Sequence, residues 1–319
     1  MNKTKIISVV NQKGGVGKTT TAANLSTALA AINKKVLLID LDPQGNASTG
    51  LGIDYSNRSN SIYEALSGSI NIESARHTTS IKNLFIIPST VELSGIEPEL
   101  LDQTNRAYVL KNLLSDDFKN QFDFIFIDCP PALSLLTVMA MTAADSVLVP
   151  LQCEFFALEG LSQLIKTIDR VRKNLNSNLS IDGIVLTMYD QRNRLSSQVA
   201  QDVRSHLKEK VFETVIPRNV RMSEAPSFGL PAIIYDHRSK GSQAYIQLAN
   251  EILKKAEEIE KNSNQLLNYT NIIKQNSLEI KKDIIEHLWK VLISDNTVDQ
   301  YESNLMRRIC GLIYFSDKE

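Results

Sequence analysis

Short apolar runs, many of them β-branched, recur along the first two thirds of the chain, and the segments between them repeat apolar residues with a helical period. Runs that are apolar at successive positions are typical of strands buried on both faces of a parallel sheet. The runs predict strands at 5–10, 36–40, 84–88, 122–128, 146–150, 181–188 and 211–216, and the segments predict helices at 19–31, 106–118, 133–143, 158–173 and 196–208. This alternation indicates an α/β fold: a mostly parallel, twisted sheet with helices on both faces.

The last part of the chain has a different pattern. A further helix is predicted at about 242–261, and the polar stretch 261–265 has no apolar period, so we place a linker there. The predicted domains are therefore 1–262 and 263–319, the second being a small helical extension. Helical spacing returns near residue 284, and a second helix is expected from Asp299, with Glu302 as its capping partner.

Composition limits the classes of protein to consider. The chain has 319 residues, enough for one large α/β domain and a small appendage. Its 35 Lys and Arg balance 36 Asp and Glu, so net charge favours neither nucleic acid nor membrane as a partner. Cys129, Cys153 and Cys310 lie among apolar residues at unrelated spacings, which favours reduced, buried thiols. Since no run of 18 apolar residues occurs, we expect a cytoplasmic protein.

A glycine-rich turn joins the first predicted strand to the first predicted helix. Its glycines let the backbone fold tightly around an anion, and the helix adds the positive end of its dipole. Lys18 is expected to reach the β- and γ-phosphates, and the Thr19 hydroxyl to bind Mg²⁺. The residues expected to contact the nucleotide here are Gly14, Gly15, Val16, Gly17, Lys18, Thr19 and Thr20. The usual pattern has Gly where Gln12 stands, and this loop holds a second lysine, Lys13.

Two predicted strands end in carboxylates. Asp40 and Asp42 close the second strand, two residues apart and so directed to the same side if the strand continues. Asp128 closes another apolar strand, as does the carboxylate that nucleotide triphosphatases place near Mg²⁺. Each aspartate could instead be a turn residue or a helix cap. Because a phosphate loop precedes them, we favour Asp42 and Asp128 as metal-site residues.

Four segments carry a resemblance to a known family: KGGVGKTTT at 13–21, LLIDLDPQGNAS at 37–48, FIFIDCPP at 124–131 and IPRNVRMSEAPSFGLP at 216–231. Together they resemble the ParA/Soj-type chromosome and plasmid partition ATPases, of the deviant Walker-A class of P-loop NTPases. The resemblance extends over residues 3–256.

The resemblance implies ATP and Mg²⁺ as cofactors and a homodimer that forms with ATP. It implies that Lys13 reaches the partner's phosphates, that Lys18 and Thr19 bind phosphate and metal, and that Asp42 positions the attacking water. Asp128 matches the family's second acidic motif. No glutamine or histidine stands at an obvious general-base position, so we expect slow intrinsic turnover that a partner stimulates.

The segment after the last predicted strand holds the residues expected to bind the adenine base and DNA. By resemblance, Pro217 and Asn219 lie near adenine, and no N-K-x-D guanine motif is present. Residues 192–240 hold nine basic side chains against five acidic ones, a plausible footprint for DNA phosphates, although a solvated basic helix face would have the same composition. The family binds double-stranded DNA without sequence preference, as ATP dimers. The residues expected to bind DNA are Arg192, Arg218, Arg221, Arg238 and Lys240.

Three other functions share such a loop. A MinD-like ATPase positioning a membrane or protein-cluster cargo would need a basic amphipathic helix, whereas residues 278–292 are nearly charge-balanced, so a membrane partner is disfavoured. An electron or metal-cluster carrier would need paired, exposed cysteines. A small-molecule ligase or amidotransferase is disfavoured by the DNA-linked segment 216–231.

The extension is the departure from this family. It is similar, over a short pattern around 284–302, to TerB-like tellurite-resistance helical domains. Asp295, Asp299 and Glu302 could suggest calcium, but the spacing and central glycine of an EF-hand are missing, so helix capping is favoured. We expect an interaction or dimer-support module. The family implies a ParB-type partner and nucleoid association.

Overall fold

The computed structural model describes residues 4–274, 277–292, 307 and 309–310. The chain divides into two compact units, Met1–Glu251 and Ile252–Glu319. Within the described residues, no helix is both long and apolar enough to cross a membrane.

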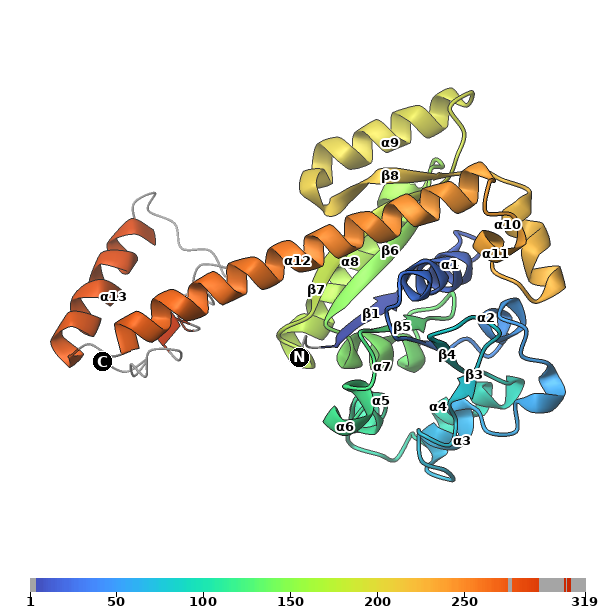
Figure 1. The fold of residues 1–319 in the computed structure, drawn as a ribbon, viewed down its shortest axis with the longest axis horizontal. Helices are drawn as coiled ribbons and strands as arrows, with labels where there is room; N and C mark the ends of the chain where they lie inside the picture. Colours follow the sequence, from blue (N-terminus) through green and yellow to red (C-terminus); the bar gives the residue numbers. More distant parts are fainter. Residues whose placement is uncertain (1–3, 275–276, 293–306, 308, 311–319) are drawn as a thin grey trace. The chain divides into compact units, whose positions relative to one another are not determined.

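The larger unit is built on one eight-stranded sheet with the order β3-β4-β2-β5-β1-β6-β7-β8 (Figure 1). The strands are β1 (Lys5–Val9), β2 (Val36–Asp40), β3 (His77–Thr78), β4 (Leu84–Ile87), β5 (Phe124–Asp128), β6 (Ser146–Gln152), β7 (Ser180–Tyr189) and β8 (Val211–Pro217). Neighbours pair in parallel except at the edge, where β3 is antiparallel to β4. The predicted α/β class and mostly parallel sheet are confirmed. The sequence pattern missed β3 because two residues make no apolar run.

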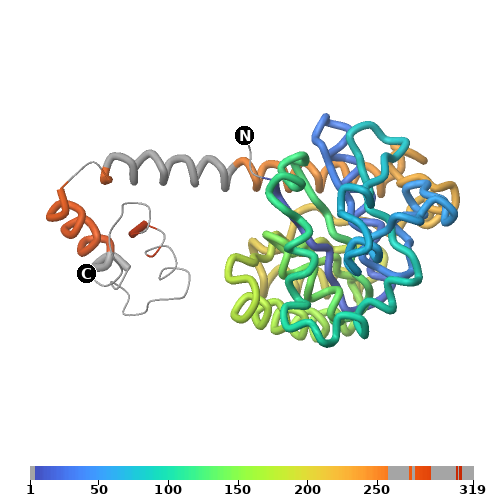
Figure 2. The backbone as a smooth tube through the Cα atoms, turned by 90° about the horizontal axis from the view of Figure 1, so that it is seen from below, coloured from blue at the N-terminus to red at the C-terminus, as the bar shows by residue number. Residues whose placement is uncertain are grey.

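Helices cover both faces of this sheet. One face carries α7, α8 and α9, and the other carries α1 and the first turns of α12, where the hydroxyls of Thr21 and Tyr245 lie 3.0 Å apart (Figure 1). The longer helices of this unit are α1 (Lys18–Ala31), α7 (Leu135–Ala143), α8 (Ala157–Asn174) and α9 (Arg194–Leu207). Helix α12 (Lys240–Lys274) begins in this unit and continues into the smaller one. Figure 2 shows the blue N-terminal strand in the interior of the unit. This agrees with the central place of β1 in the strand order.

Short helices fill the connections. They are α2 (Asn46–Gly50), α3 (Ile62–Ser67), α4 (Ile96–Glu99), α5 (Val109–Leu113), α6 (Asp116–Lys119), α10 (Arg221–Glu224) and α11 (Ala232–Tyr235). The single helix predicted at 106–118 is wrong: Leu114 leaves helical geometry (φ −79°, ψ 62°), and the Ser115 hydroxyl accepts a hydrogen bond from the Phe118 amide to start α6. A capping serine inside an apolar pattern therefore divides the segment.

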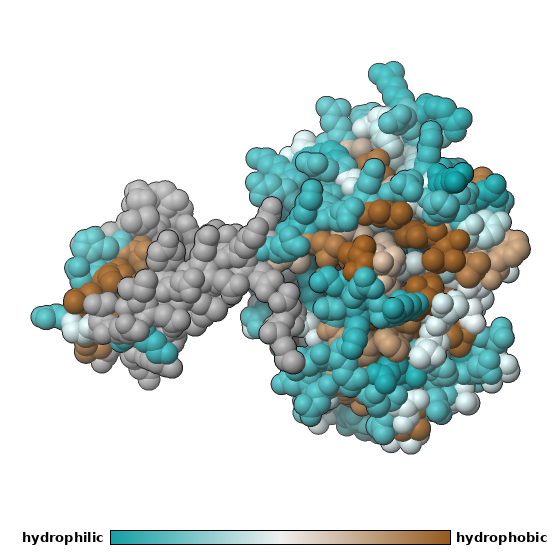
Figure 3. Space-filling view, in the orientation of Figure 1, coloured by the Kyte–Doolittle hydropathy of each residue, from teal (hydrophilic) through white to brown (hydrophobic). Residues whose placement is uncertain are grey.

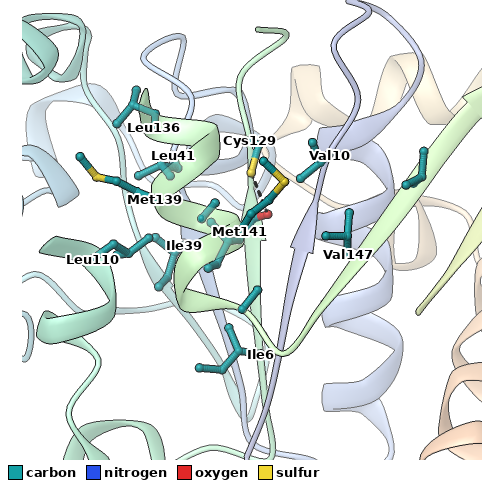
Figure 4. Packing of buried hydrophobic residues seen from close by; sticks show 14 of the residues in the cluster. Ile6, Val10, Ile39, Leu41, Leu110, Cys129, Leu136, Met139, Met141 and Val147 are labelled. Carbon is teal, nitrogen blue, oxygen red and sulfur yellow. Dashed lines mark hydrogen bonds between the residues drawn. The ribbon is translucent and has the colours of Figure 1, made fainter. Parts of the chain in front are cut away.

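The core follows from strands that are apolar on both faces. On the α7 side, Figure 4 shows Leu136 and Met139 of α7 beside Ile39 of β2 and Leu41, which follows it. Cys129 lies in the same cluster and donates to the Ile127 carbonyl, with 3.7 Å between sulfur and oxygen. Burial raises the pKa of this thiol well above its usual range. All three cysteines are free and buried, as predicted.

The smaller unit has its own buried cluster. In α13 (Leu278–Leu292), Ile285 is buried with Ile309 and Cys310, and Ile273 and Leu288 pack against them. Part of the apolar stripe of α13 is thus buried inside this unit. The second helix predicted from Asp299, its capping pair and the rejected calcium ligands Asp295, Asp299 and Glu302 lie outside the described residues.

The polar stretch 261–265 is not a break between helices. It lies inside α12, which continues to Lys274, so the predicted linker is wrong. The stretch holds neither glycine nor proline, and polarity alone does not end a helix.

Candidate nucleotide-binding site

The candidate groups meet at one edge of the sheet because parallel strands end together there. In register, Asp128 of β5 lies opposite Val9 of β1 and opposite Asp40 of β2. The loop that follows β1 therefore lies beside both strand-terminal carboxylates. This edge is where open α/β sheets bind ligands.

The loop backbone is held in the shape that an anion cradle requires. Gly15 (φ 74°) and Gly17 (φ 89°) are both left-handed, and Gly17 is the N-cap of α1. The Val16 carbonyl accepts a hydrogen bond of 2.8 Å from the Thr187 hydroxyl of β7. The Asn11 side chain donates to the Pro150 carbonyl at 2.7 Å and accepts from the Lys13 amide at 3.0 Å. Two strands thus fix the loop before any ligand arrives.

The two lysines of the loop have opposite environments. Lys18 is 6% exposed, and its ammonium donates to the Lys13 carbonyl at 3.0 Å. Burial lowers the Lys18 pKa, and the nearby Asp128 carboxylate opposes this shift. The Lys13 side chain is 51% exposed, and its ammonium pairs with Glu154 of the same chain. Lys18 therefore lies inside the loop, while Lys13 lies along its outer surface.

The three aspartates differ in their partners. Asp40 is fully buried and accepts from the Ser48 amide (2.8 Å) and hydroxyl (2.7 Å), and burial raises its pKa to about 6. Asp42 is nearly buried and accepts from the Gln44 amide at 3.0 Å. Asp40 and Asp42 therefore have different roles although both lie near the end of β2. The Asp40 carboxylate is occupied by hydrogen bonds within the protein, and Asp42 lies in the turn that follows.

Asp128 differs from Asp40 and Asp42 in its hydrogen bonding. Both carboxylate oxygens are buried and lack a hydrogen bond of good geometry. Burial and the charge of Asp40 raise its pKa well above the usual range, and the adjacent Thr19 hydroxyl opposes the rise. An unpaired buried carboxylate is costly, and a cation or a metal-bound water would satisfy it.

These residues fit a magnesium nucleotide. Within the described part of the chain, no group of three or more His, Cys, Asp and Glu could hold a metal by itself. Mg²⁺ commonly keeps waters and phosphate oxygens and takes only one or two protein ligands. Thr19 and Asp128 would supply that small share, and Gly14 to Thr20 would surround the phosphates.

The expected base-binding residues lie at the end of β8. Pro217 closes that strand, and the Arg218 amide donates to the Tyr189 carbonyl of β7 at 3.1 Å. The Asn219 side-chain oxygen accepts from the Arg221 amide at 2.9 Å, which uses it as the cap of its own turn. Since β7 also holds Val16, the same strand supports both the phosphate loop and this segment.

The expected DNA-binding residues lie on the surface, and two of them are already paired. Arg192 makes hydrogen bonds of 3.0 and 2.9 Å to Asp190, and Arg221 pairs with Glu224 (2.7 Å) and Asp236 (3.4 Å). The other three, Arg218, Arg238 and Lys240, are exposed. Figure 3 shows apolar residues at the surface of this unit in the region of α10 and α11. Val220, Phe228 and Ile234 are the exposed large apolar residues of this segment.

Comparison with known proteins identifies the family. Residues 4–181 match the family described as an AAA domain. The chromosome partitioning protein ParA of Caulobacter vibrioides is 56% identical over 253 residues, covering 79% of this chain and 95% of that protein. The chain belongs to the ParA/Soj family of partition ATPases. The sporulation initiation inhibitor Soj of Bacillus subtilis is 50% identical over 248 residues, covering 78% of this chain and 98% of Soj.

Two further matches concern the nucleotide and the C-terminal part of the chain. The structure of a cobyrinic acid a,c-diamide synthase from Mycobacterium smegmatis with ADP and magnesium has a TM-score of 0.70 and 37% identity, covering 79% of this chain and 94% of that one. Residues 243–319 match the family of the tellurite resistance protein TerB. The predicted partition-ATPase and TerB resemblances are therefore confirmed, and a nucleotide with magnesium occurs among solved relatives.

Sequence reasoning missed residues that hold the site from outside the motifs. Glu154, which pairs with Lys13, and Arg58, which is buried against the turn that follows Asp42, were not predicted. Arg58 stands in the polar run DYSNRSN, where no local pattern indicates burial.

Proposed function

We propose that this chain is an ATPase that dimerises with ATP, binds double-stranded DNA without sequence preference as that dimer, and leaves DNA on hydrolysis. With a ParB-type partner it would segregate a chromosome or plasmid, associated with the nucleoid. The loop with two lysines, one buried and one on the surface, carries the proposal, because a single-site ATPase needs only the buried one.

The residues of the loop would hold the nucleotide. Lys18 would contact the β- and γ-phosphates, and the loop amides and the α1 N-terminus would bind their oxygens. Thr19 and Asp128, with Asp42, would hold Mg²⁺, which when bound neutralises charge on the phosphates. Asp42 would orient the attacking water, and Pro217 and Asn219 would border adenine.

Lys13 is placed to act on a second copy. Its ion pair with Glu154 is partly exposed, and such pairs contribute only about 0 to 1 kcal/mol, so the ammonium can leave it. In a dimer it would stabilise the charge that spreads over the partner's γ-phosphoryl oxygens, as an arginine finger does. Phe155 and Phe156 follow Glu154, are 73% and 67% exposed, and offer an apolar surface that a second copy would cover.

Dimerisation would also set DNA affinity. The exposed residues Arg218, Arg221, Arg238 and Lys240 would form a modest basic surface on one copy, and Arg192 in the loop after β7 would add to it. Two copies double the phosphate contacts, and each contact releases counterions, so affinity rises with ATP and falls steeply with salt.

The alternatives have less support. A MinD-like membrane role would use the apolar stripe of α13, but Ile285 of that stripe is buried inside the smaller unit. Pelleting with anionic liposomes and ATP would reveal it. A ligase role is favoured only by the likeness to the Mycobacterium smegmatis synthase. The three buried cysteines do not suit a metal-cluster carrier.

The C-terminal extension, which we place at 263–319, would be an interaction or dimer-support module. From Lys261 onward the chain holds eight basic and eight acidic residues, so DNA contact is not expected there.

Fluorescence anisotropy with two unrelated duplexes tests the proposal. Binding should require ATP, be equal for both sequences and weaken steeply between 50 and 200 mM salt, by a factor of about 10³ or more if six or more phosphates are contacted. Tight binding without nucleotide, or a clear preference for one duplex, would contradict it.

A further inference from the structure

One buried arginine outside the motifs is tied to the turn that carries Asp42. Arg58 is 4% exposed, and its guanidinium donates to oxygen atoms of the backbone and of one hydroxyl. The acceptors are the carbonyls of Ile53 (3.1 and 2.6 Å), Gly45 (3.2 Å) and Ser89 (3.3 Å), and the Thr49 hydroxyl (2.8 Å). Three of these acceptors belong to the segment 42–53, which begins with Asp42.

The guanidinium meets this segment at its tightest turn. The Gly45 amide donates to the Asp42 carbonyl at 2.9 Å, and Gly45 has φ 61°. A Cβ on Gly45 would lie 2.5 Å from the Arg58 Nη1. The turn that orients Asp42 is therefore in direct contact with Arg58.

Asp40 and Ser48 anchor the same segment from the other side. Asp40 holds the Ser48 amide and hydroxyl, and the Ser48 oxygen accepts from the Ser89 amide at 3.0 Å. The Ser89 carbonyl is in turn an acceptor of Arg58. The segment is thus fixed to the ends of β2 and β4 by buried polar groups.

Stability alone is a weak reason for this arrangement. A buried guanidinium is costly to desolvate, and apolar residues often replace buried charges without loss of stability. Arginine differs from lysine in its rigid fork of five donors, which can hold several oxygens at fixed relative positions. Here those oxygens belong to the irregular backbone that follows a strand.

We propose that Arg58 is a positioning residue for ATP hydrolysis, which holds the 42–53 segment so that Asp42 can orient the attacking water. The inference rests on the proposed function, because it takes Asp42 as the water-positioning residue. Arg58 acts through the segment and needs no contact with the nucleotide.

The test compares Arg58→Lys with the wild type. Lysine keeps the charge but cannot hold the oxygens together, so the hydrolysis rate should fall at least about 10-fold, given that a misplacement of about 1 Å can cost about 100-fold. The dissociation constant for a fluorescent ATP analogue should stay within about 3-fold of the wild type, because the phosphate loop is untouched. A merely structural residue would not separate these two constants.

The matched control is Arg76→Lys. Arg76 is a partly buried arginine of the same unit, which pairs with Glu73 and donates a hydrogen bond to Gln121. Its substitution should change neither constant. Thr49→Val removes one Arg58 acceptor at nearly constant volume and should lower the hydrolysis rate by a smaller factor. If Arg58→Lys shows no cooperative thermal transition, the rate of Thr49→Val tests the positioning role in its place.

Failure of this inference can be told from failure of the proposed function. An unchanged rate in Arg58→Lys and Thr49→Val, with Asp42→Ala inactive, would overturn only the positioning role. Equal losses of rate and nucleotide affinity would overturn it as well. Normal hydrolysis by Asp42→Ala would overturn both.

Discussion

The nucleotide edge of the sheet and the basic surface near α10 hold their charged groups in different ways. At the edge, Lys18, Asp40 and Asp128 are buried at strand or helix ends, and their neighbours are set by backbone pairing. On the surface, Arg192 and Arg221 are exposed and paired with acidic neighbours. A misplaced charge is costly where it is buried, so each charged residue at the edge has one fixed position and set of neighbours. A surface cation contributes little by itself, so a neighbouring cation can replace it.

The largest expected effect is at Lys18. Lys18→Ala should weaken nucleotide binding by roughly 30-fold or more, because loss of one partner of a buried charge pair costs about 2–5 kcal/mol. Isothermal titration with an ATP analogue measures it. Lys34→Ala, in the turn that follows the C-terminal end of α1, serves as control. Undiminished nucleotide binding by Lys18→Ala would contradict the claim that buried charges at the edge of the sheet have larger effects than surface charges.

Asp42 should separate binding from chemistry. Asp42→Ala should lower the hydrolysis rate by about 100-fold, within the range for loss of a group that orients or activates water, and keep nucleotide affinity within about 3-fold. Asp54→Ala changes an exposed aspartate in the same connection and should leave both constants unchanged. Normal turnover by Asp42→Ala would show that the water-positioning role is wrongly assigned.

On the basic surface, single changes should have smaller, graded effects. Arg218→Ala should reduce the slope of log affinity for DNA against log salt by about 1, which is the share of one phosphate neutralised by one cation. Nucleotide binding should stay unchanged. The control is Lys35→Ala, an exposed lysine just before β2 and so at the opposite end of the strands. Equal slopes for the two variants would remove Arg218 from the interface.

The smallest effect is expected from the extension. Deletion of residues 264–319 should leave basal hydrolysis within about 2-fold, because the larger unit has its own core and a stable domain of this size needs no further support. Steady-state hydrolysis by the shortened chain measures this. Capture of a partner protein should be weakened. A large loss of hydrolysis would instead make the extension part of the catalytic dimer.

The strand ends and the glycine turn at this edge of the sheet could be predicted from the sequence for physical reasons. β2 and β5 are apolar on both faces, so their ends at Asp40 and Asp128 were visible as a change from apolar to charged residues. Gly15 and Gly17 occupy left-handed conformations, which is why a glycine pattern marks the loop. Residue types that are neighbours in sequence were enough to predict these features.

Other features depend on tertiary contacts that no local pattern shows. Arg58 is in a polar run yet buried, because its partners come from Gly45 and Ser89 elsewhere in the chain. The ion pair of Lys13 with Glu154 joins residues far apart in sequence. The helix predicted at 106–118 failed on one serine cap, and the linker predicted at 261–265 failed because a polar stretch can remain helical.

The central claim is that Lys13 acts on the nucleotide of a second copy, and mixing two inactive variants tests it most directly. Lys13→Gln and Asp42→Ala should each bind ATP but hydrolyse it poorly. In a mixed dimer, one site combines an intact Asp42 with an intact Lys13 from the partner. An equimolar mixture should therefore regain about one quarter of wild-type activity, since about half of random pairs are mixed and each has one intact site. A mixture no more active than its two components would contradict the account.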